Sequence, residues 1–173
     1  MRKYDPDIHH RRSIRLKGYD YSQSGAYFLT ICTQNRECLF GGIENGSVCL
    51  NGYGKIASET WDWLSKRYYY LQLEKWVIMP NHLHGIIKIN NAACRGGSRT
   101  APTPTIKPLG RIIGAYKTVS TKQINQIRNT PGISVWQRNY YEHIIRNDDE
   151  YKRITDYIMN NPKTWEKDKL WIE

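Results

Sequence analysis

Residues 73–89 read LEKWVIMPNHLHGIIKI, a run rich in the β-branched and aromatic residues that favour strands. Pro80 interrupts this run, because a proline cannot donate to a ladder of backbone hydrogen bonds. The run therefore predicts a long strand region with a bulge or a break at Pro80. Within it, His82 and His84 are two residues apart, so on a strand both side chains project from one face and Leu83 enters the other.

Strand and helix patterns alternate on both sides of this run. A strand is predicted at 26–34, a hairpin at 38–51 around the Asn45-Gly46 turn, and another strand near 134–146. Apolar residues at helical spacing predict helices at 55–70, 109–128 and 148–161. Asn147 is a good cap for the last helix, and Pro162 ends it. This order predicts an α+β fold, with one antiparallel sheet and helices packed on it; a ferredoxin-like arrangement is the most economical.

Composition divides the chain into a basic N-terminal lead-in at 1–24 and one folded domain at 25–173. Within that domain, residues 90–108 are rich in glycine and proline and predict a mobile linker. The N-terminus has no apolar segment typical of a secretory signal, and no apolar run approaches the roughly 20 residues of a membrane helix. We therefore expect a cytoplasmic protein with no membrane partner.

The charge of the chain favours a polyanionic partner. Lys and Arg number 26 against 16 Asp and Glu, so the formal net charge is +10. Lysines and arginines that contact phosphates release condensed counterions, which makes nucleic acid a natural partner. Basic proteins without this role also exist, so charge by itself leaves the function open.

Two short patterns contain residues suited to metal binding or catalysis, and each also has an ordinary structural interpretation. His82 and His84 side by side provide half of a divalent-metal site, or are simply a pair on a solvated sheet face. Tyr157 and Asn161 are i and i+4 on the last helix, so they share a face. Tyr157 is then either part of a site or an amphipathic tyrosine at the edge of the core.

A third pattern, WQRNYYEH at 136–143, interleaves aromatic, basic and amide groups. Such a stretch is suited to stacking bases and holding phosphates, and Arg138 is its cation. The same aromatic residues are equally suited to packing a core.

Three blocks together resemble the tyrosine transposases of the IS200/IS605 type in the HUH superfamily, and most of all the REP-associated tyrosine transposases. They are RSIRLKGYDYSQSGAYFLTICTQNR at 12–36, VIMPNHLHGII at 77–87, and VWQRNYYEHIIRNDDEYKRITDYIMNNP at 135–162. The combination in this order is specific, whereas the His-hydrophobe-His element alone is not.

The resemblance implies a ferredoxin-like catalytic domain with defined roles for four residues. His82 and His84 correspond to the two metal-ligating histidines, and Tyr157 to the nucleophile. The amide of Asn161 corresponds to the third protein ligand, at a position where relatives often carry glutamine. Tyr151, six residues earlier, is the rival nucleophile, but it lacks the amide at i+4. The resemblance gives His143 no defined role.

The resemblance also implies a reaction and a substrate. With Mg²⁺ or Mn²⁺ bound, the tyrosine attacks single-stranded DNA and forms a 5′-phosphotyrosine bond that a 3′-hydroxyl later reverses. Hairpins, in particular repetitive extragenic palindromes, are the expected targets. Candidate phosphate contacts are Arg11, Arg12, Arg15, Lys117 and Arg138. The family includes both homodimers and monomers, so the oligomeric state stays open.

Other functions compete with this one. A non-catalytic binder of single-stranded RNA or DNA on an RRM-like sheet would explain the charge and the aromatic residues, but the chain lacks the aromatic-rich RNP1 pattern. A relaxase-type or replication-initiation nickase shares the chemistry, usually in a larger protein. A metal-dependent hydrolase would make Tyr157 structural. Covalent capture of DNA separates these alternatives.

Overall fold

The computed structural model describes Leu16 and residues 18–90 and 106–171. These residues form a four-stranded sheet, a separate two-stranded hairpin and three α-helices. In chain order the elements are β1 (Gly25–Cys32), η1 (Gln34–Arg36), β2 (Gly41–Glu44), β3 (Ser47–Leu50), α1 (Gly52–Arg67), β4 (Leu71–Met79), β5 (His82–Ile89), α2 (Leu109–Ile127), β6 (Tyr141–Ile145), α3 (Asp148–Asn160) and η3 (Asn161–Lys167).

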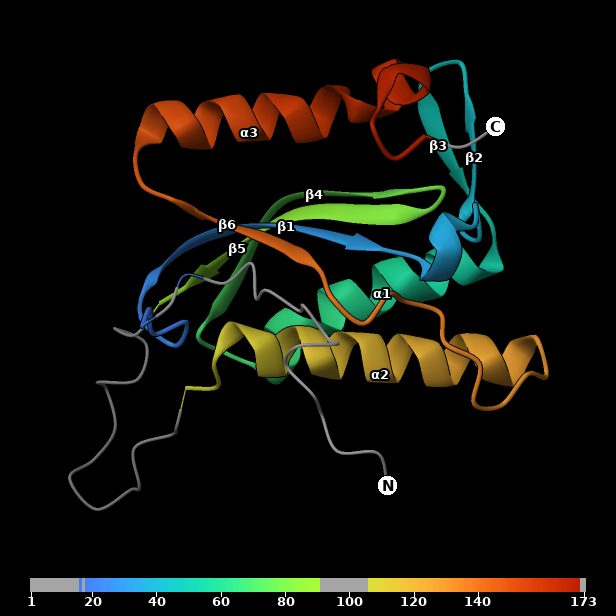
Figure 1. Cartoon of the computed structure of the whole chain (residues 1–173), viewed down its shortest axis with the longest axis horizontal. Helices are drawn as coiled ribbons and strands as arrows, with labels where there is room; N and C mark the ends of the chain where they lie inside the picture. The colour runs from blue at the N-terminus through green and yellow to red at the C-terminus, as the bar shows by residue number, and fades with distance from the viewer. Residues whose placement is uncertain (1–15, 17, 91–105, 172–173) are drawn as a thin grey trace, which may run out of the picture.

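The main sheet is antiparallel, with strand order β4-β5-β1-β6. Without the β2–β3 hairpin and α3, the chain order is β1-α1-β4-β5-α2-β6, which is the split βαβ pattern of a ferredoxin-like fold. Helices α1 and α2 lie on one face of the sheet and α3 lies on the other (Figure 1). The predicted α+β class, ferredoxin-like sheet and single domain are therefore confirmed.

The strand region predicted at 73–89 is a hairpin that turns back at Pro80. Strand β4 ends at Met79, β5 begins at His82, and these two residues pair across the turn. The carbonyl of Pro80 accepts from the N–H of Phe40, at 2.9 Å, and so links the turn to the chain before β2. The proline breaks the run, as the sequence predicted, and the break reverses the direction of the chain.

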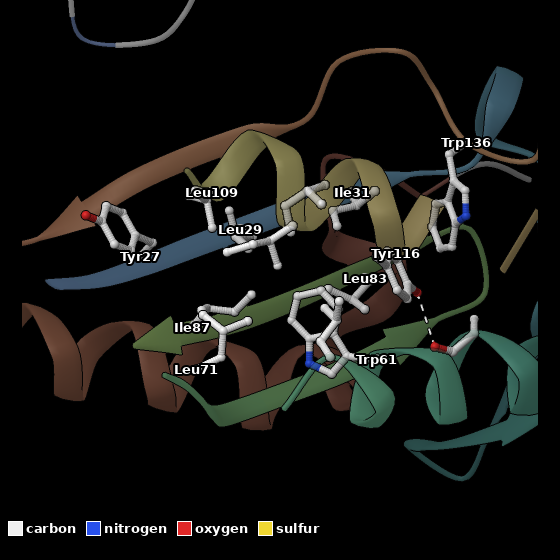
Figure 2. Close-up of a cluster of buried hydrophobic side chains, with 14 of the residues drawn as sticks. Tyr27, Leu29, Ile31, Trp61, Leu71, Leu83, Ile87, Leu109, Tyr116 and Trp136 are labelled. Atoms are coloured by element: carbon white, nitrogen blue, oxygen red, sulfur yellow. Dashed lines mark hydrogen bonds between the residues drawn. The ribbon is translucent and has the colours of Figure 1, made fainter. Parts of the chain in front are cut away.

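The main hydrophobic core lies between the sheet and the helices α1 and α2 (Figure 2). Trp61 of α1 and Tyr116 of α2 are fully buried, with their rings edge to face at 5.2 Å. The Tyr116 hydroxyl donates to the carbonyl of Ala57 at 3.3 Å, which joins the two helices. Helix α1 begins three residues before the predicted position 55, because the side chain of Asn51 caps it by accepting from two backbone N–H groups.

Helix α3 covers the opposite face through a smaller apolar cluster. Ile154 and Ile158 pack on Phe28 of β1 and Ile86 of β5. The side chain of Asn147 accepts from the N–H of Glu150 and caps the helix, as predicted. Because the two isoleucines face the sheet, the neighbouring side of α3 lies at the border between this cluster and solvent.

The strand predicted near 134–146 is shorter than expected, since β6 covers only 141–145. The ammonium of Lys117 on α2 donates to the carbonyls of Gln137 and Asn139, at 2.8 and 3.0 Å. These bonds fold the segment toward α2, and beside the end of β1 it forms only an isolated bridge, between Trp136 and Thr33. Trp136 is its anchor, with the indole N–H donating to Ser120 Oγ at 2.9 Å.

Two predicted segments fall largely outside the described residues. They are the basic lead-in at 1–24 and the linker at 90–108, of which 1–15, 17 and 91–105 are not described. Among the helices that are described, none has the length and apolar character needed to cross a membrane.

Candidate metal and tyrosine site

His82 and His84 project from β5 on the sheet face that α3 covers. Alternate residues of a strand take opposite faces, so Leu83 enters the main core while Ile86 packs under α3. The two imidazole rings are 4.4 Å apart between centroids, and both side chains are buried. The structure therefore places both histidines on one face, next to each other and shielded from solvent.

Asn81 determines which nitrogen of His82 carries the proton. Its amide nitrogen donates to the carbonyls of Arg36 and Leu170, at 3.0 and 2.8 Å. Its amide oxygen lies 2.7 Å from Nδ1 of His82 and can only accept, so Nδ1 must donate. Nε2 of the neutral ring is therefore unprotonated, and it is buried with no hydrogen-bond partner among the described residues.

Burial keeps both imidazoles neutral. It lowers the pKa of His82 to about 2, with repulsion from His84 as the next cause. It also lowers the pKa of His84 to about 4, although the carboxylate of Asp168 opposes this shift. Nδ1 of His84 lies 2.8 Å from Thr30 Oγ1, and its Nε2 points out of the sheet. Both rings are thus in the protonation state that metal ligands require.

Tyr157 reaches this pair from α3. Its side chain is 45% exposed, and its hydroxyl lies 3.0 Å from Nε2 of His84 and 3.2 Å from Oδ2 of Asp168. Burial raises the pKa of Tyr157 well above its usual range, and the nearby Asp168 carboxylate raises it further. The group at the centre of the site is therefore a neutral phenol at pH 7.

Asp168 is the residue of this site that sequence reasoning missed. η3 continues from α3 and ends at Lys167, so the next residue returns to the histidines. One ligating atom from each of His82, His84 and Asp168 lies within 4.8 Å of the others. Burial by itself raises the pKa of Asp168, but hydrogen bonds from Asn161 and from the Leu170 N–H outweigh it and hold the pKa below its usual value. This carboxylate is ionised at neutral pH.

Asn161 follows α3 one turn after Tyr157 and is almost fully buried. Its Nδ2 donates to Oδ2 of Asp168 at 2.6 Å. The amide is therefore oriented with its nitrogen on the carboxylate. Its oxygen, Oδ1, is buried with no hydrogen-bond partner in the described part of the chain.

The donors present here fit a divalent cation. A buried acceptor without a donor costs about 1–3 kcal/mol, and Nε2 of His82 and Oδ1 of Asn161 are two such atoms. His82 lies in a cluster with a second imidazole, His84, and the anionic carboxylate of Asp168, and Asn161 donates to this carboxylate. Imidazole, amide and carboxylate ligands suit Mn²⁺, and the oxygen ligands suit Mg²⁺. A cation bound beside the histidines would give Nε2 of His82 the partner that it lacks.

A relative in Haemophilus influenzae establishes the family of the chain. This uncharacterized protein is 41% identical over 179 residues, which covers 99% of the present chain and 98% of the relative. The two proteins belong to one family. No family model matches the chain.

A solved structure establishes the type of fold. The REP-associated tyrosine transposase bound to a REP hairpin matches with a TM-score of 0.58, at 18% sequence identity, over 90% of this chain and 74% of that one. The chain has the fold of a tyrosine transposase. The fold that the residue blocks predicted is thus the fold of this chain.

In this tyrosine-transposase fold, the rival tyrosine is engaged elsewhere. The Tyr151 hydroxyl donates to Glu74 of β4 at 2.8 Å, and Lys88 of β5 binds the same carboxylate at 2.9 Å. The Lys88 ammonium also lies 4.7 Å from the centre of the Tyr151 ring. Tyr151 therefore joins α3 to the β4 edge of the sheet, whereas the hydroxyl of Tyr157 lies beside His84.

His143, which the resemblance left without a role, connects β6 to α3. Its Nε2 lies 2.7 Å from one oxygen of Glu150, and the other oxygen accepts from the Arg146 N–H at 2.9 Å. Glu150 belongs to the first turn of α3, the helix that carries Tyr157. His143 thus helps to set the position of that helix on the sheet.

The predicted phosphate contacts differ in their surroundings. Lys117 directs its ammonium to backbone carbonyls and lies 5.2 Å from the Tyr140 ring, so its donors are used within the transposase fold. Arg138 is exposed. Arg11, Arg12 and Arg15 lie outside the described residues.

Proposed function

We propose that this chain is a divalent-metal-dependent enzyme that cleaves and rejoins single-stranded DNA through a covalent bond to Tyr157. The observation that carries the proposal is the position of the Tyr157 hydroxyl, 3.0 Å from a buried imidazole and 3.2 Å from a half-buried carboxylate. A tyrosine that only closed the edge of the core would not need its hydroxyl between two such groups. The tyrosine-transposase fold agrees with this chemistry.

His82, His84 and Asn161 would hold a Mg²⁺ or Mn²⁺ ion, with the negative charge of Asp168 beside them. When bound, the ion neutralises the scissile phosphate and polarises it for attack. Asn81 keeps Nδ1 of His82 protonated and so leaves Nε2 free to ligate. Asp168 keeps the Asn161 amide turned so that its oxygen remains available.

Tyr157 supplies the nucleophile. Its oxygen forms a bond to phosphorus while the bond from phosphorus to the 3′ oxygen breaks. Asp168 orients the phenol by accepting its hydrogen bond; the phenol proton is released to solvent as the bond to phosphorus forms, and the departing 3′ oxygen takes up a proton from solvent to become a hydroxyl. The 5′ phosphate stays on Tyr157. Attack by a 3′-hydroxyl reverses the step, so the bond energy is conserved and no nucleotide cofactor is needed.

Single-stranded DNA beside a hairpin is the proposed substrate. The transposase that shares this fold was solved bound to a REP hairpin. The net charge of +10 favours a polyanion in the present chain as well. We assign Arg138 and the lead-in residues Arg11, Arg12 and Arg15 as phosphate contacts, and we rank Lys117 below them because its ammonium is directed to backbone carbonyls.

Covalent capture tests this function. A library of labelled DNA hairpins with random single-stranded flanks is incubated with protein and Mn²⁺, and adducts that survive denaturation are isolated and sequenced. Tyr157→Phe is compared with Tyr151→Phe, a matched variant that loses a hydroxyl from the same helix. The His82→Ala/His84→Ala double variant and addition of EDTA test the dependence on metal.

We expect an adduct with wild-type protein and with Tyr151→Phe, and none with Tyr157→Phe, the double histidine variant or EDTA. An adduct that disappears in Tyr151→Phe but persists in Tyr157→Phe would identify Tyr151 as the nucleophile instead. Tight binding of hairpins without any adduct from wild-type protein would favour a non-catalytic binder of single strands. Metal-dependent cleavage that leaves no adduct would favour a hydrolase.

A further inference from the structure

Helix α3 contacts the end of β6 through His143 and Ile145 but leaves the start of this strand open. The helix packs mainly against β4, at the opposite edge, with weaker contact to β5 (Figure 1). Tyr141 begins β6 on the open side, and its side chain is 51% exposed. A large aromatic side chain is thus exposed beside the candidate site.

The strand register puts Tyr141 on the same face as the histidines. Thr30 of β1 pairs with His84 on one side and with Tyr141 on the other. Residues paired across neighbouring strands project from the same face, and strands lie about 4.8 Å apart, so Tyr141 and His84 are separated by roughly 10 Å along one row of the sheet.

Phe28 bridges the two ends of this row. Its ring is stacked on His84 at 5.5 Å and lies edge to face with Tyr157 and with Tyr141, each at 6.2 Å between centroids. The aromatic surface is therefore continuous from the candidate nucleophile to the sheet edge. Phe28 is buried in this series, whereas Tyr141 has surface free to contact another ring.

We propose that Tyr141 is a base-stacking residue, which holds an unpaired base of the DNA strand next to the scissile phosphate. This inference rests on the proposed function. Aromatic side chains stack on any base, and a distance of roughly 10 Å from the metal ligands is on the order of one or two nucleotides of an extended strand. Only an unpaired base presents its face to a ring, so Tyr141 selects single-stranded over duplex DNA at this position.

The test uses equilibrium binding in a Tyr157→Phe background, where no cleavage occurs. The probe is a DNA hairpin with a single-stranded oligothymidine flank that carries 2-aminopurine at one position at a time, since stacking on an aromatic side chain quenches this base. Tyr141→Ala is compared with Tyr141→Phe, which keeps the ring. Tyr69→Ala is the matched control, because Tyr69 is also half exposed but precedes β4 at the other edge of the sheet.

We expect quenching at one or two adjacent flank positions. Tyr141→Ala should remove it and weaken binding roughly 10-fold, whereas Tyr141→Phe and Tyr69→Ala should retain both. An abasic residue at the quenched position should weaken binding to the background protein but not to the Tyr141→Ala protein. If Tyr141→Ala does not fold, Tyr141→Trp reports the same contact through loss of its own fluorescence when DNA binds.

Equal quenching and affinity in the Tyr141→Ala and background proteins would overturn the stacking role. This outcome is distinct from failure of the proposed function. Adduct formation by wild-type protein decides the function, and it is measured separately from these binding experiments.

Discussion

The Asn161 amide nitrogen donates to Oδ2 of Asp168 at 2.6 Å, and the same carboxylate oxygen accepts from the Tyr157 hydroxyl at 3.2 Å. One carboxylate thus connects the candidate ligand at the end of α3 with the candidate nucleophile one turn earlier. It also turns the Asn161 oxygen away from itself and leaves this oxygen as a buried acceptor. Metal affinity and the orientation of the phenol should therefore both depend on Asp168.

Asp168→Asn should weaken Mn²⁺ binding by about 10-fold to 100-fold, measured by titration calorimetry on the protein without DNA. The substitution removes the negative charge beside the ligands and replaces an acceptor of Asn161 with a group that also contains a donor. Asp156→Asn is the control, because Asp156 is exposed on α3, the helix that carries Tyr157. Equal Mn²⁺ affinity in the two variants would show that Asp168 does not contribute to metal binding.

Asn81→Ala should lower the free energy of unfolding by about 1–3 kcal/mol and weaken Mn²⁺ binding about 10-fold. The variant leaves Nδ1 of His82 and two backbone carbonyls without their buried partner. Urea unfolding and calorimetry measure the two effects. Asn160→Ala, which loses only an exposed bond to the carbonyl of Asp156, should change neither; a similar loss there would mean that Asn81 has no special role.

Gly85→Ala and Gly114→Ala should change stability in opposite directions. A Cβ on Gly85 would lie 2.9 Å from the Trp61 ring and 3.1 Å from Cβ of Trp76, so overpacking should cost about 1–3 kcal/mol. A Cβ on Gly114 of α2 meets no atom within 4 Å, and alanine should stabilise this helix by about 0.5–1 kcal/mol. Thermal unfolding of both variants checks the signs, and a stabilising Gly85→Ala would contradict the packing under Trp61.

Glu150→Gln should destabilise the protein at pH 7, and less so as the pH falls below about 4. The backbone N–H of Arg146, and then His143, lower the pKa of Glu150 in the folded state. A carboxyl group whose folded pKa lies below its unfolded value of about 4.3 stabilises the fold above that pH and loses this contribution as the pH falls through the folded pKa.

The difference in melting temperature between wild type and Glu150→Gln should therefore shrink as the pH drops below about 4. A difference that stays constant from pH 7 to pH 3 would show that shape, and not charge, is responsible. Glu59→Gln, an exposed change on α1, is the control.

Local patterns predicted most elements of the fold because their causes are local. The bounds of α2 and α3 followed to within one residue from apolar spacing and from caps such as Asn147, whereas α1 begins and ends three residues earlier than predicted. The break at Pro80 followed from its missing N–H. The 134–146 strand was predicted too long, since Lys117, distant in sequence, holds the carbonyls of its first half. No pattern within that segment indicates such a contact.

The sequence by itself determined which pairs of candidate residues share a face. His82 and His84 do so because strands repeat every two residues, and Tyr157 and Asn161 because helices repeat every 3.6 residues. Only the tertiary structure decided that the two pairs meet, since α3 packs on the sheet through contacts between distant segments. The same applies to Asp168, which returns to the histidines after η3, and to Tyr141, which joins their row through the pairing of β1 with β6. Repeating backbone geometry is encoded locally, whereas the convergence of segments depends on the core that they bury together.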